Sequence, residues 1–256
     1  MAYWLDQFHV FLLVLLRVGA VLIVAPIFGH HNYLTQAKVG LAFMVSLVIF
    51  PLVAAHHPAI PAGLFPYALM LMREAVLGLV LGYAVLLLFI GIQFAGQLAG
   101  LQMGLDIVDV IDPHSTGSIS VLGQYLNILA ILILLSIDGH HLVLQGLARS
   151  FEVIPLGGVV LKEAVMLKLI ALTSEVFVIA IKIAAPVILA LFLVSVALGV
   201  LARTVPQMNI LMVGFPVQLA AGLGVLVASL PLFYLLMTKL IGALSRHLQA
   251  LIAFMS

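Results

Sequence analysis

Long apolar runs, separated by short polar stretches, constrain this chain more than any other feature of its sequence. The first run covers residues 10–28, which is long enough for a helix to cross about 30 Å of hydrocarbon at about 1.5 Å per residue. Two more runs cover 39–55 and 119–137. The run over 75–105 carries no charge and is longer than one span needs, so we expect it to bend or to leave the membrane.

The second half of the chain continues the same pattern. A helical pattern covers 162–202, and its membrane span is expected over 183–202. Residues 204–238 carry no charge but contain three prolines, so at least one break is expected there. The sequence therefore predicts an all-α membrane protein with about six hydrophobic segments, some of them broken or kinked, which pack as helical hairpins.

Composition shows that this chain cannot cover itself with a water-facing surface. Hydrophobic residues make up 65% of it and charged residues 7%, against about a quarter charged in soluble domains. Lipid or partner subunits must therefore solvate most of the surface. No linker divides the chain, so we expect one membrane-embedded domain over 1–256. The first sixteen residues contain no Lys or Arg, so they do not form a cleavable signal and are expected to remain.

Several classes of function find no support. The net charge is +1 without a basic patch, which argues against nucleic-acid binding, and there is no cysteine for a disulfide or a thiolate ligand. Three adjacent histidine pairs, at 30–31, 56–57 and 140–141, are poor metal ligands because neighbouring helical side chains point about 100° apart. Motifs of metalloproteases, serine hydrolases and phosphate-binding loops are missing. We expect no enzyme activity, no cofactor and no bound metal.

Polar residues inside the apolar runs are the candidates for function. Arg17 costs about 3 kcal/mol at a bilayer centre on insertion scales, so it marks a functional or intersubunit site unless its side chain reaches the interface. A polar series could line a pathway or could join helices at about 1 kcal/mol each. Its members are Gln93, Gln97, Gln102, Gln124 and Asn127.

Glycines recur every four residues at Gly78 and Gly82, and again at Gly96, Gly100 and Gly104. A helix face without side chains can receive another backbone closely. Two interpretations stay open, ordinary packing within the chain or a dense interface with other subunits.

The stretch 202–216, Ala-Arg-Thr-Val-Pro-Gln-Met-Asn-Ile-Leu-Met-Val-Gly-Phe-Pro, resembles a block that marks the FliR family of flagellar export-apparatus proteins, related to the SctT proteins of injectisomes. Further blocks follow the family order over nearly the whole chain. They are Arg17-Val-Gly-Ala, Pro26-Ile-Phe-Gly, Gly96-Gln-Leu-Ala-Gly-Leu-Gln, Asp112-Pro, Asp138-Gly-His and Ser150-Phe-Glu-Val-Ile-Pro-Leu-Gly.

The resemblance implies an export gate in the bacterial inner membrane, within the flagellar basal body. One such subunit would assemble with several FliP and FliQ homologues, next to FlhB and FlhA, and would pass unfolded flagellar proteins without chemistry of its own. The family also implies that apolar segments lie partly above the bilayer, covered by partners.

The resemblance also assigns roles to residues. The loop around Asp-Pro would plug the closed pore, which corresponds here to Asp106, Ile107, Val108, Asp109, Val110, Ile111, Asp112, Pro113, His114, Ser115, Thr116 and Gly117. Asp106 and Asp109 make this loop more acidic than the usual family pattern. Residues assigned to assembly are Arg17, Gly96, Gly100, Gly104, Arg203, Pro206, Gln207 and Asn209.

A second hypothesis is a small-solute transporter that works alone. Arg17, Glu175 and Lys182 would then bind the solute together with the glutamines, near broken helices. Neither a matched pair of broken segments nor an internal repeat supports this hypothesis.

Overall fold

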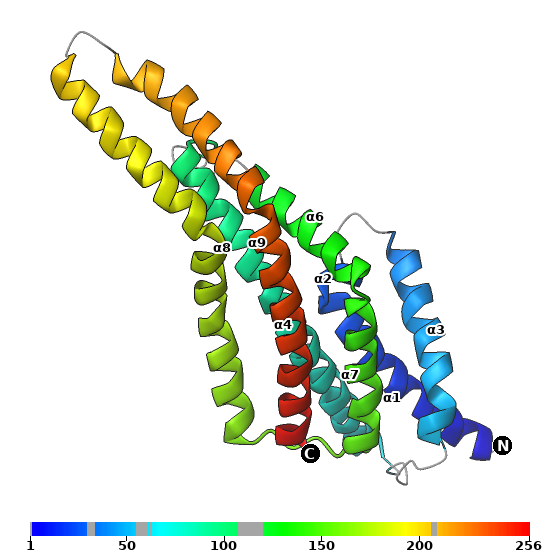
Figure 1. Ribbon diagram of the computed structural model, residues 1–256. Helices are drawn as coiled ribbons and strands as arrows, with labels where there is room; N and C mark the ends of the chain where they lie inside the picture. Colours follow the sequence, from blue (N-terminus) through cyan, green and yellow to red (C-terminus); the bar gives the residue numbers. More distant parts are fainter. Residues whose placement is uncertain (1, 30–33, 55–60, 62, 107–119, 206–208) are drawn as a thin grey trace. The chain divides into compact units, whose positions relative to one another are not determined.

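The computed structural model describes residues 2–29, 34–54, 61, 63–106, 120–205 and 209–256, and the regular structure within them is α-helical (Figure 1). The helices are α1 (Ala2–Val24), α2 (Pro26–Gly29), α3 (Thr35–Ala54), α4 (Leu64–Met103), α6 (Val121–Ser136), α7 (Gly139–Val153), α8 (Glu163–Thr204) and α9 (Ile210–Met255). The all-α prediction is confirmed.

Five of these helices, α1, α3, α4, α8 and α9, are long and apolar enough to cross a membrane. The pair α6 and α7 is bent and makes a sixth span if it counts as one. The bend lies at Asp138-Gly139, a residue pair that favours turns, where Asp138 adopts a left-handed conformation with φ 56°. The expectation of about six hydrophobic segments is therefore confirmed.

The chain folds into two compact units. Unit 1 contains Met1–Leu87, Asp138–Leu172 and Ile241–Ser256, and unit 2 contains Leu88–Ile137 and Thr173–Leu240. The boundaries fall inside α4, α8 and α9, so each of these helices contributes to both units. The expectation of a single domain stays a prediction.

Unit 1 is organised around α1. The inward face of this helix buries Leu13, Val14 and Val18 completely, because apolar residues there recur at helical spacing. Its other side receives α3, where Phe11 makes edge-to-face contacts with Phe43 at 5.4 Å and Phe50 at 5.8 Å between ring centroids.

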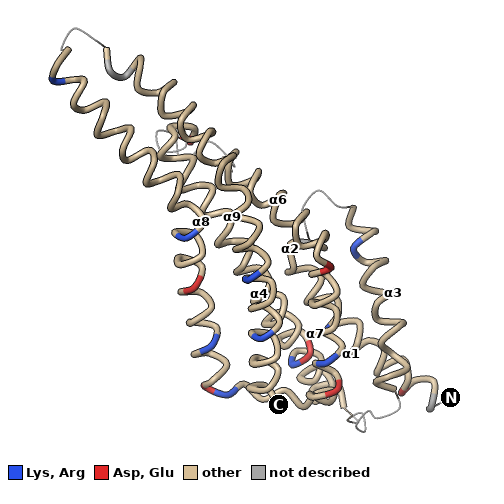
Figure 2. Tube along the Cα trace, viewed as in Figure 1, with Lys and Arg blue, Asp and Glu red and all other residues tan. Residues whose placement is uncertain are grey.

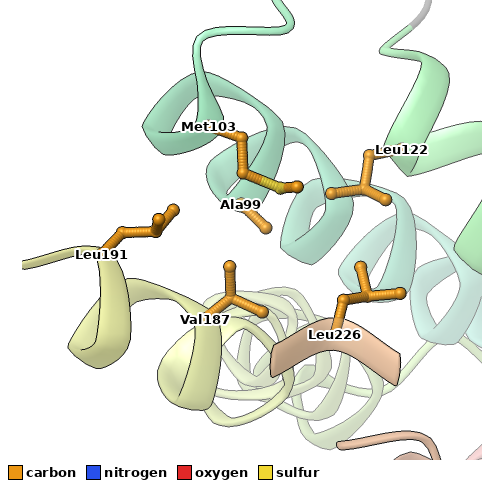
Figure 3. Packing of buried hydrophobic residues seen from close by; sticks show 6 residues of the cluster. All are labelled: Ala99, Met103, Leu122, Val187, Leu191 and Leu226. Carbon is orange, nitrogen blue, oxygen red and sulfur yellow. The ribbon is translucent and has the colours of Figure 1, made fainter. Parts of the chain in front are cut away.

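Unit 2 has a small apolar core where the end of α4 meets α6, α8 and α9 (Figure 3). Its six buried side chains come from all four helices and are Ala99, Met103, Leu122, Val187, Leu191 and Leu226. Met103 is the last residue of α4 and is fully buried, so this core fixes the end of that helix.

The structure sets the limits of the two longest apolar runs. Residues 64–103 form one helix, so the helix begins well before the charge-free run that starts at residue 75. The pair Arg73-Glu74 does not end the helix, because the Glu74 carboxylate has a buried partner. The break expected in the last apolar run is confirmed between Thr204 and Ile210, while Pro216 and Pro231 lie within α9, as membrane helices tolerate.

Candidate functional site

A buried ion pair lies at the centre of unit 1. Arg17 on α1 and Glu74 on α4 are both fully buried, and Arg17 Nε donates to Glu74 Oε2 at 2.5 Å. The guanidinium carbon also lies 4.1 Å from the centre of the Phe151 ring, which shields it from the other side. A charge this deep in an apolar unit is tolerated only with such partners.

The end of α7 supplies the remaining acceptors for Arg17. Its Nη1 donates to the carbonyl oxygens of Ser150 at 3.0 Å and Ile154 at 3.3 Å, and Nη2 also reaches the Ile154 carbonyl at 3.3 Å. Carbonyl groups at a helix C-terminus carry partial negative charge; the Ser150 carbonyl also accepts from the Ile154 N–H at 3.0 Å, and Arg17 adds a second donor to it. The Arg17 guanidinium therefore donates to carbonyl groups at the end of α7, and the Glu74 carboxylate neutralises its positive charge.

Gly157 connects Glu74 to the chain that follows α7. Its N–H donates to Glu74 Oε1 at 2.7 Å, and its carbonyl accepts from Arg73 Nη1 at 3.0 Å. Gly157 has φ +74°, and a side chain there would also overlap Met70, so only glycine suits this turn. Both oxygens of Glu74 are thus engaged, one by Arg17 and one by the backbone.

Close approach of α1 and α4 brings the ion pair together. A Cβ atom on Gly78 would lie 2.5 Å from the Arg17 carbonyl oxygen, and one on Gly82 would lie 2.9 Å from the Val24 side chain. These glycines follow Glu74 at four-residue spacing, so they share its helix face. Of the two interpretations of the glycine pattern, packing within the chain holds here.

The Arg17 centre joins two sequence blocks that lie far apart in the chain, around Arg17 and around 150–157. Sequence reasoning assigned no role to Glu74, Ser150 or Gly157, although an arginine in an apolar run already requires a nearby carboxylate. The Arg17 side chain has no exposed surface. Any part that Arg17 has in assembly therefore acts through the shape of unit 1.

Unit 2 contains a second close approach, between α4 and α6. A Cβ atom on Gly96 would overlap the backbone of Gly123. One turn later, a Cβ atom on Gly100 would overlap the Asp106 carboxylate and lie 3.3 Å from the Ser120 hydroxyl oxygen. Gly96 and Gly100 thus also serve packing within the chain, and their assignment to subunit assembly stays a prediction.

Gly104 differs from the expected helix-face pattern. It lies just beyond the end of α4 with φ +81°, where glycine is favoured. The Gly104 N–H donates to the Leu101 carbonyl at 3.1 Å and the Leu105 N–H to the Gly100 carbonyl at 3.0 Å. These two bonds form a Schellman motif, so Gly104 ends the helix and does not extend its glycine face.

Asp106 lies at the described end of the predicted plug. It is 4% exposed, and its Oδ2 has no hydrogen-bond partner among the described residues. The rest of the predicted plug, residues 107–117, lies outside the described residues, and so do Pro206 and Gln207. The plug assignment stays a prediction.

The other two residues of the strongest family block lie next to the break between α8 and α9. Arg203 is exposed in the last turn of α8. Asn209 precedes α9, and its carbonyl and side-chain Oδ1 accept from the Met212 N–H at 3.1 and 3.3 Å. Asn209 therefore acts as the N-cap of α9. Its role in assembly stays a prediction.

The polar series on α4 and α6 faces outward. Gln93, Gln97, Gln102 and Gln124 are exposed, and Asn127 is partly buried with its Oδ1 unpartnered in the described part of the chain. Within the described residues these exposed glutamines form no hydrogen bond to another helix. They are available to a partner subunit or to a passage.

The described residues offer little space for catalysis. A pocket within unit 2, between Ala95, Pro186 and Ser229, holds about 20 Å³, which is room for a single water molecule. An open groove of about 620 Å³ in unit 1 has Arg73 as its one charged lining residue beside Leu69, Met72 and the 158–161 segment. Neither lining contains an acid–base pair or an activated nucleophile.

One cluster in the described structure could hold a metal ion. Ligand atoms of Asp138, His140 and His141 lie within 4.8 Å of one another at the start of α7. The two imidazole rings are closer than the sequence argument assumed, with centroids 4.1 Å apart. Asp138 and His141 are exposed and lie 3.6 Å apart, which a simple charge interaction explains. The expected absence of a metal stays a prediction, and the other histidine pairs lie outside the described residues.

Comparison with known proteins gives a consistent result along the chain. Residues 8–244 match the family described as bacterial export proteins, family 1. The flagellar biosynthetic protein FliR of Bacillus subtilis is 31% identical over 252 residues, which cover 97% of this chain and 96% of that protein. The FliR of Escherichia coli is 32% identical over 229 residues, with 90% and 87% covered. That of Pectobacterium carotovorum is 33% identical over 234 residues, with 91% and 87% covered.

Proposed function

Because the chain belongs to the bacterial export proteins of family 1, we propose that it is a membrane subunit of the flagellar protein export gate. This membership confirms the resemblance predicted from the sequence blocks, and the family is one of export proteins and not of enzymes. In the proposal the chain assembles with FliP and FliQ homologues into a conduit for unfolded flagellar proteins, and it performs no chemical step itself.

The observation that carries the proposal is the exposed apolar surface of α8 and α9 in unit 2. The helix α8 has no charged residue between Lys182 and Arg203, and α9 has none before Lys239. Figure 2 shows long stretches of α8 and α9 with neither blue nor red. Large apolar side chains on both helices are exposed by half or more of their area. They include Phe192, Leu193, Val196, Val200, Met212, Val227 and Leu235. Surfaces of this kind need lipid or protein to cover them.

Helix length favours protein over lipid for part of this surface. The helices α4, α8 and α9 have 40, 42 and 46 residues. At about 1.5 Å per residue they extend over about 60 to 70 Å, roughly twice the hydrocarbon thickness. Apolar residues beyond the hydrocarbon must be covered by other polypeptides. This supports an assembly in which such segments lie partly above the bilayer.

The exposed glutamines support a passage at the assembled interface. An export path for unfolded polypeptides must accept many different side chains and must hydrogen-bond extended backbone groups in passing. A neutral amide can both donate and accept hydrogen bonds, and it does not retain passing polypeptide segments of one charge. We therefore place Gln93 and Gln97 of α4 and Gln124 of α6 along the conduit or at its subunit contacts.

The segment 106–117 is proposed as the plug of the closed conduit. The segment contains Pro113 and Gly117, and a segment with proline and glycine rearranges at lower cost than a helix. The gate belongs in this proposal to the inner membrane at the flagellar basal body, where FlhB and FlhA homologues would adjoin it. Assembly roles for Arg203, Pro206, Gln207 and Asn209 are part of the same proposal.

Co-purification tests the assembly role. The chain, co-expressed with the FliP and FliQ homologues of its own organism and carrying the only affinity tag, should recover both in a detergent-stable complex. Recovery of the chain alone, while the other two assemble without it, would refute the proposal.

Conductance tests the plug. Deletion of 108–117 should leave the complex intact and raise its ion conductance in planar bilayers, because the closed path loses its obstruction. An intact complex with unchanged conductance would refute the plug.

The small-solute transporter remains the competing hypothesis. It required Arg17 to bind a solute, but the guanidinium already donates to Glu74 and to the carbonyls at the end of α7. Vesicles that contain the purified chain by itself distinguish the two hypotheses. Saturable uptake of a small solute would favour the transporter and count against the gate.

A further inference from the structure

We propose that the open groove of unit 1 binds an anionic phospholipid, with the phosphate group against Arg73 and an acyl chain along the apolar walls. The groove holds about 620 Å³, and small-molecule sites occupy about 300–1,000 Å³. Its walls are Leu69, Met72, Arg73 and Val76 of α4 and the segment 158–161. The site belongs wholly to unit 1 and does not depend on the gate function proposed above.

One face of α4 forms the first wall. Residues 69, 72, 73 and 76 follow the spacing i, i+3, i+4 and i+7, so their side chains lie on one face of the helix. Leu69 is 40% exposed and Met72 is 62% exposed, although both are apolar. An exposed apolar stripe of this kind is covered by an apolar molecule.

The second wall is the connection between α7 and α8, which is not helical. Val160 and Leu161 are exposed there, and the Val160 N–H donates to the Met255 carbonyl at 3.1 Å. Irregular backbone that faces lipid does not occur within the hydrocarbon layer. The charged residues Lys162 and Glu163 follow directly. This wall of the groove therefore belongs at the depth of the lipid headgroups.

Arg73 is the cation of the groove. Its Nη1 donates to the Gly157 carbonyl at 3.0 Å, which holds the guanidinium beside the second wall, and the side chain is exposed. The neighbouring Glu74 carboxylate is already engaged, because its two oxygens accept from Arg17 Nε and from the Gly157 N–H. A guanidinium carries five N–H donors in a fork that matches the oxygens of a phosphate group. Arg73 thus supplies both positive charge and hydrogen-bond donors to the groove.

A cation beside apolar walls at headgroup depth matches one class of molecule. An anionic phospholipid combines a phosphate group, which the guanidinium binds, with acyl chains that cover apolar side chains. Basic pockets at the membrane surface recognise such headgroups. Free phosphate would leave Leu69, Met72 and Leu161 uncovered. A zwitterionic lipid brings a positive group of its own next to Arg73.

The affinity of the purified full chain for lipid tests the headgroup contact. Native mass spectrometry in detergent, with added phosphatidylglycerol or with phosphatidylcholine of the same acyl chains, gives a dissociation constant for each lipid. We expect phosphatidylglycerol to bind about fivefold more tightly, equivalent to about 1 kcal/mol for one arginine near anionic lipid. Equal dissociation constants would overturn the proposal.

Two substitutions remove this preference by different routes. Arg73→Gln deletes the charge, whereas Leu69→Glu keeps Arg73 and adds a carboxylate four residues before it, which pairs with the guanidinium. Both should abolish the preference for phosphatidylglycerol, and Arg73→Lys should retain it. Arg246→Gln is the matched control, because Arg246 is exposed in the same unit and lies outside the groove lining. A preference that persists in Arg73→Gln, or that Arg246→Gln abolishes equally, would overturn the site.

A photoreactive lipid locates the acyl chain in the unchanged protein. Phosphatidylglycerol with a diazirine in one acyl chain should label residues 69–76 and 158–161 on illumination, and an excess of unlabelled phosphatidylglycerol should suppress this labelling. Peptide mapping by mass spectrometry identifies the labelled segments. Labelling confined to other parts of the chain would overturn the proposal.

A photo-crosslinking residue distinguishes lipid from polypeptide in the assembled protein. Leu161 is 62% exposed at the groove, so benzoylphenylalanine in its place reports what lies there in intact membranes. We expect an adduct with the mass of a phospholipid and no adduct with another polypeptide. A polypeptide adduct at this position would mean that a partner subunit fills the groove, and it would overturn the lipid site.

Discussion

The two units differ in how completely their buried ionisable groups are hydrogen-bonded. In unit 1, Arg17 donates to a carboxylate and to two backbone carbonyls, and Glu74 uses both of its oxygens. In unit 2, Asp106 is almost as deeply buried, but its Oδ2 has no partner among the described residues. A fully bonded centre fixes one structure, whereas the described residues leave the Asp106 Oδ2 without a bond to fix it.

The largest expected effect tests whether the Arg17 centre is structural. Glu74→Ala leaves the guanidinium buried without its carboxylate and should lower the free energy of unfolding by about 3–5 kcal/mol. Thermal unfolding and yield of the purified complex measure this loss. Glu163→Ala is the control, because Glu163 is exposed. If the two variants are equally stable, the ion pair of Arg17 and Glu74 does not stabilise unit 1, and the difference drawn between the two units fails.

Glycine substitutions distinguish glycines that pack against backbone atoms of another segment from a glycine that packs against a side chain. Gly78→Ala and Gly96→Ala each place a methyl group against backbone atoms of the opposite segment, so we expect each to lower the unfolding free energy by about 1–3 kcal/mol. Gly100→Ala should cost less, because Asp106 can move. Gly19→Ala meets nothing within 4 Å and should be neutral or slightly stabilising. Chemical denaturation of all four variants ranks them, and a Gly100→Ala cost equal to that of Gly96→Ala would contradict the ranking.

The smallest expected effect concerns the Ser150 hydroxyl, which is one of several hydrogen-bond acceptors around Arg17. The Ser150 hydroxyl oxygen lies 3.4 Å from Arg17 Nη1, which is long for a hydrogen bond. The carbonyls of Ser150 and Ile154 still accept from Arg17 after the hydroxyl is removed. Ser150→Ala should therefore reduce the unfolding free energy by about 0.5–1 kcal/mol, within the range of one ordinary hydrogen bond. A loss close to that of Glu74→Ala would mean that the Arg17 network fails as a whole when any member is removed.

Apolar runs and turn residues were enough to predict the helices but not all of their limits. The Asp138-Gly139 turn and the connection through Gly157 follow from local chemistry, and both are observed. The start of α4 could not be read from the charge-free run, because the helix continues through Arg73-Glu74 and one member of that pair is a buried partner. Gly104 followed the spacing of a helix face yet ends the helix, and spacing alone cannot distinguish these two uses of glycine.

The candidate site was predicted in part. Arg17 stood out from sequence because an unpartnered arginine is costly in an apolar run. Its acceptors could not be identified, since two of them are backbone carbonyls of Ser150 and Ile154, and any residue type supplies a carbonyl.

The pairing of Arg17 with Glu74 also has a consequence for biosynthesis. A ribosome delivers Arg17 to the membrane before Glu74 exists, and the carbonyls at the end of α7 follow later still. Until then, α1 carries a lone positive charge that costs about 2.5–3.5 kcal/mol at the bilayer centre. Nascent chains arrested before residue 74 should hold α1 in the bilayer less firmly than longer ones, so this helix reaches its final depth only after α4 has arrived.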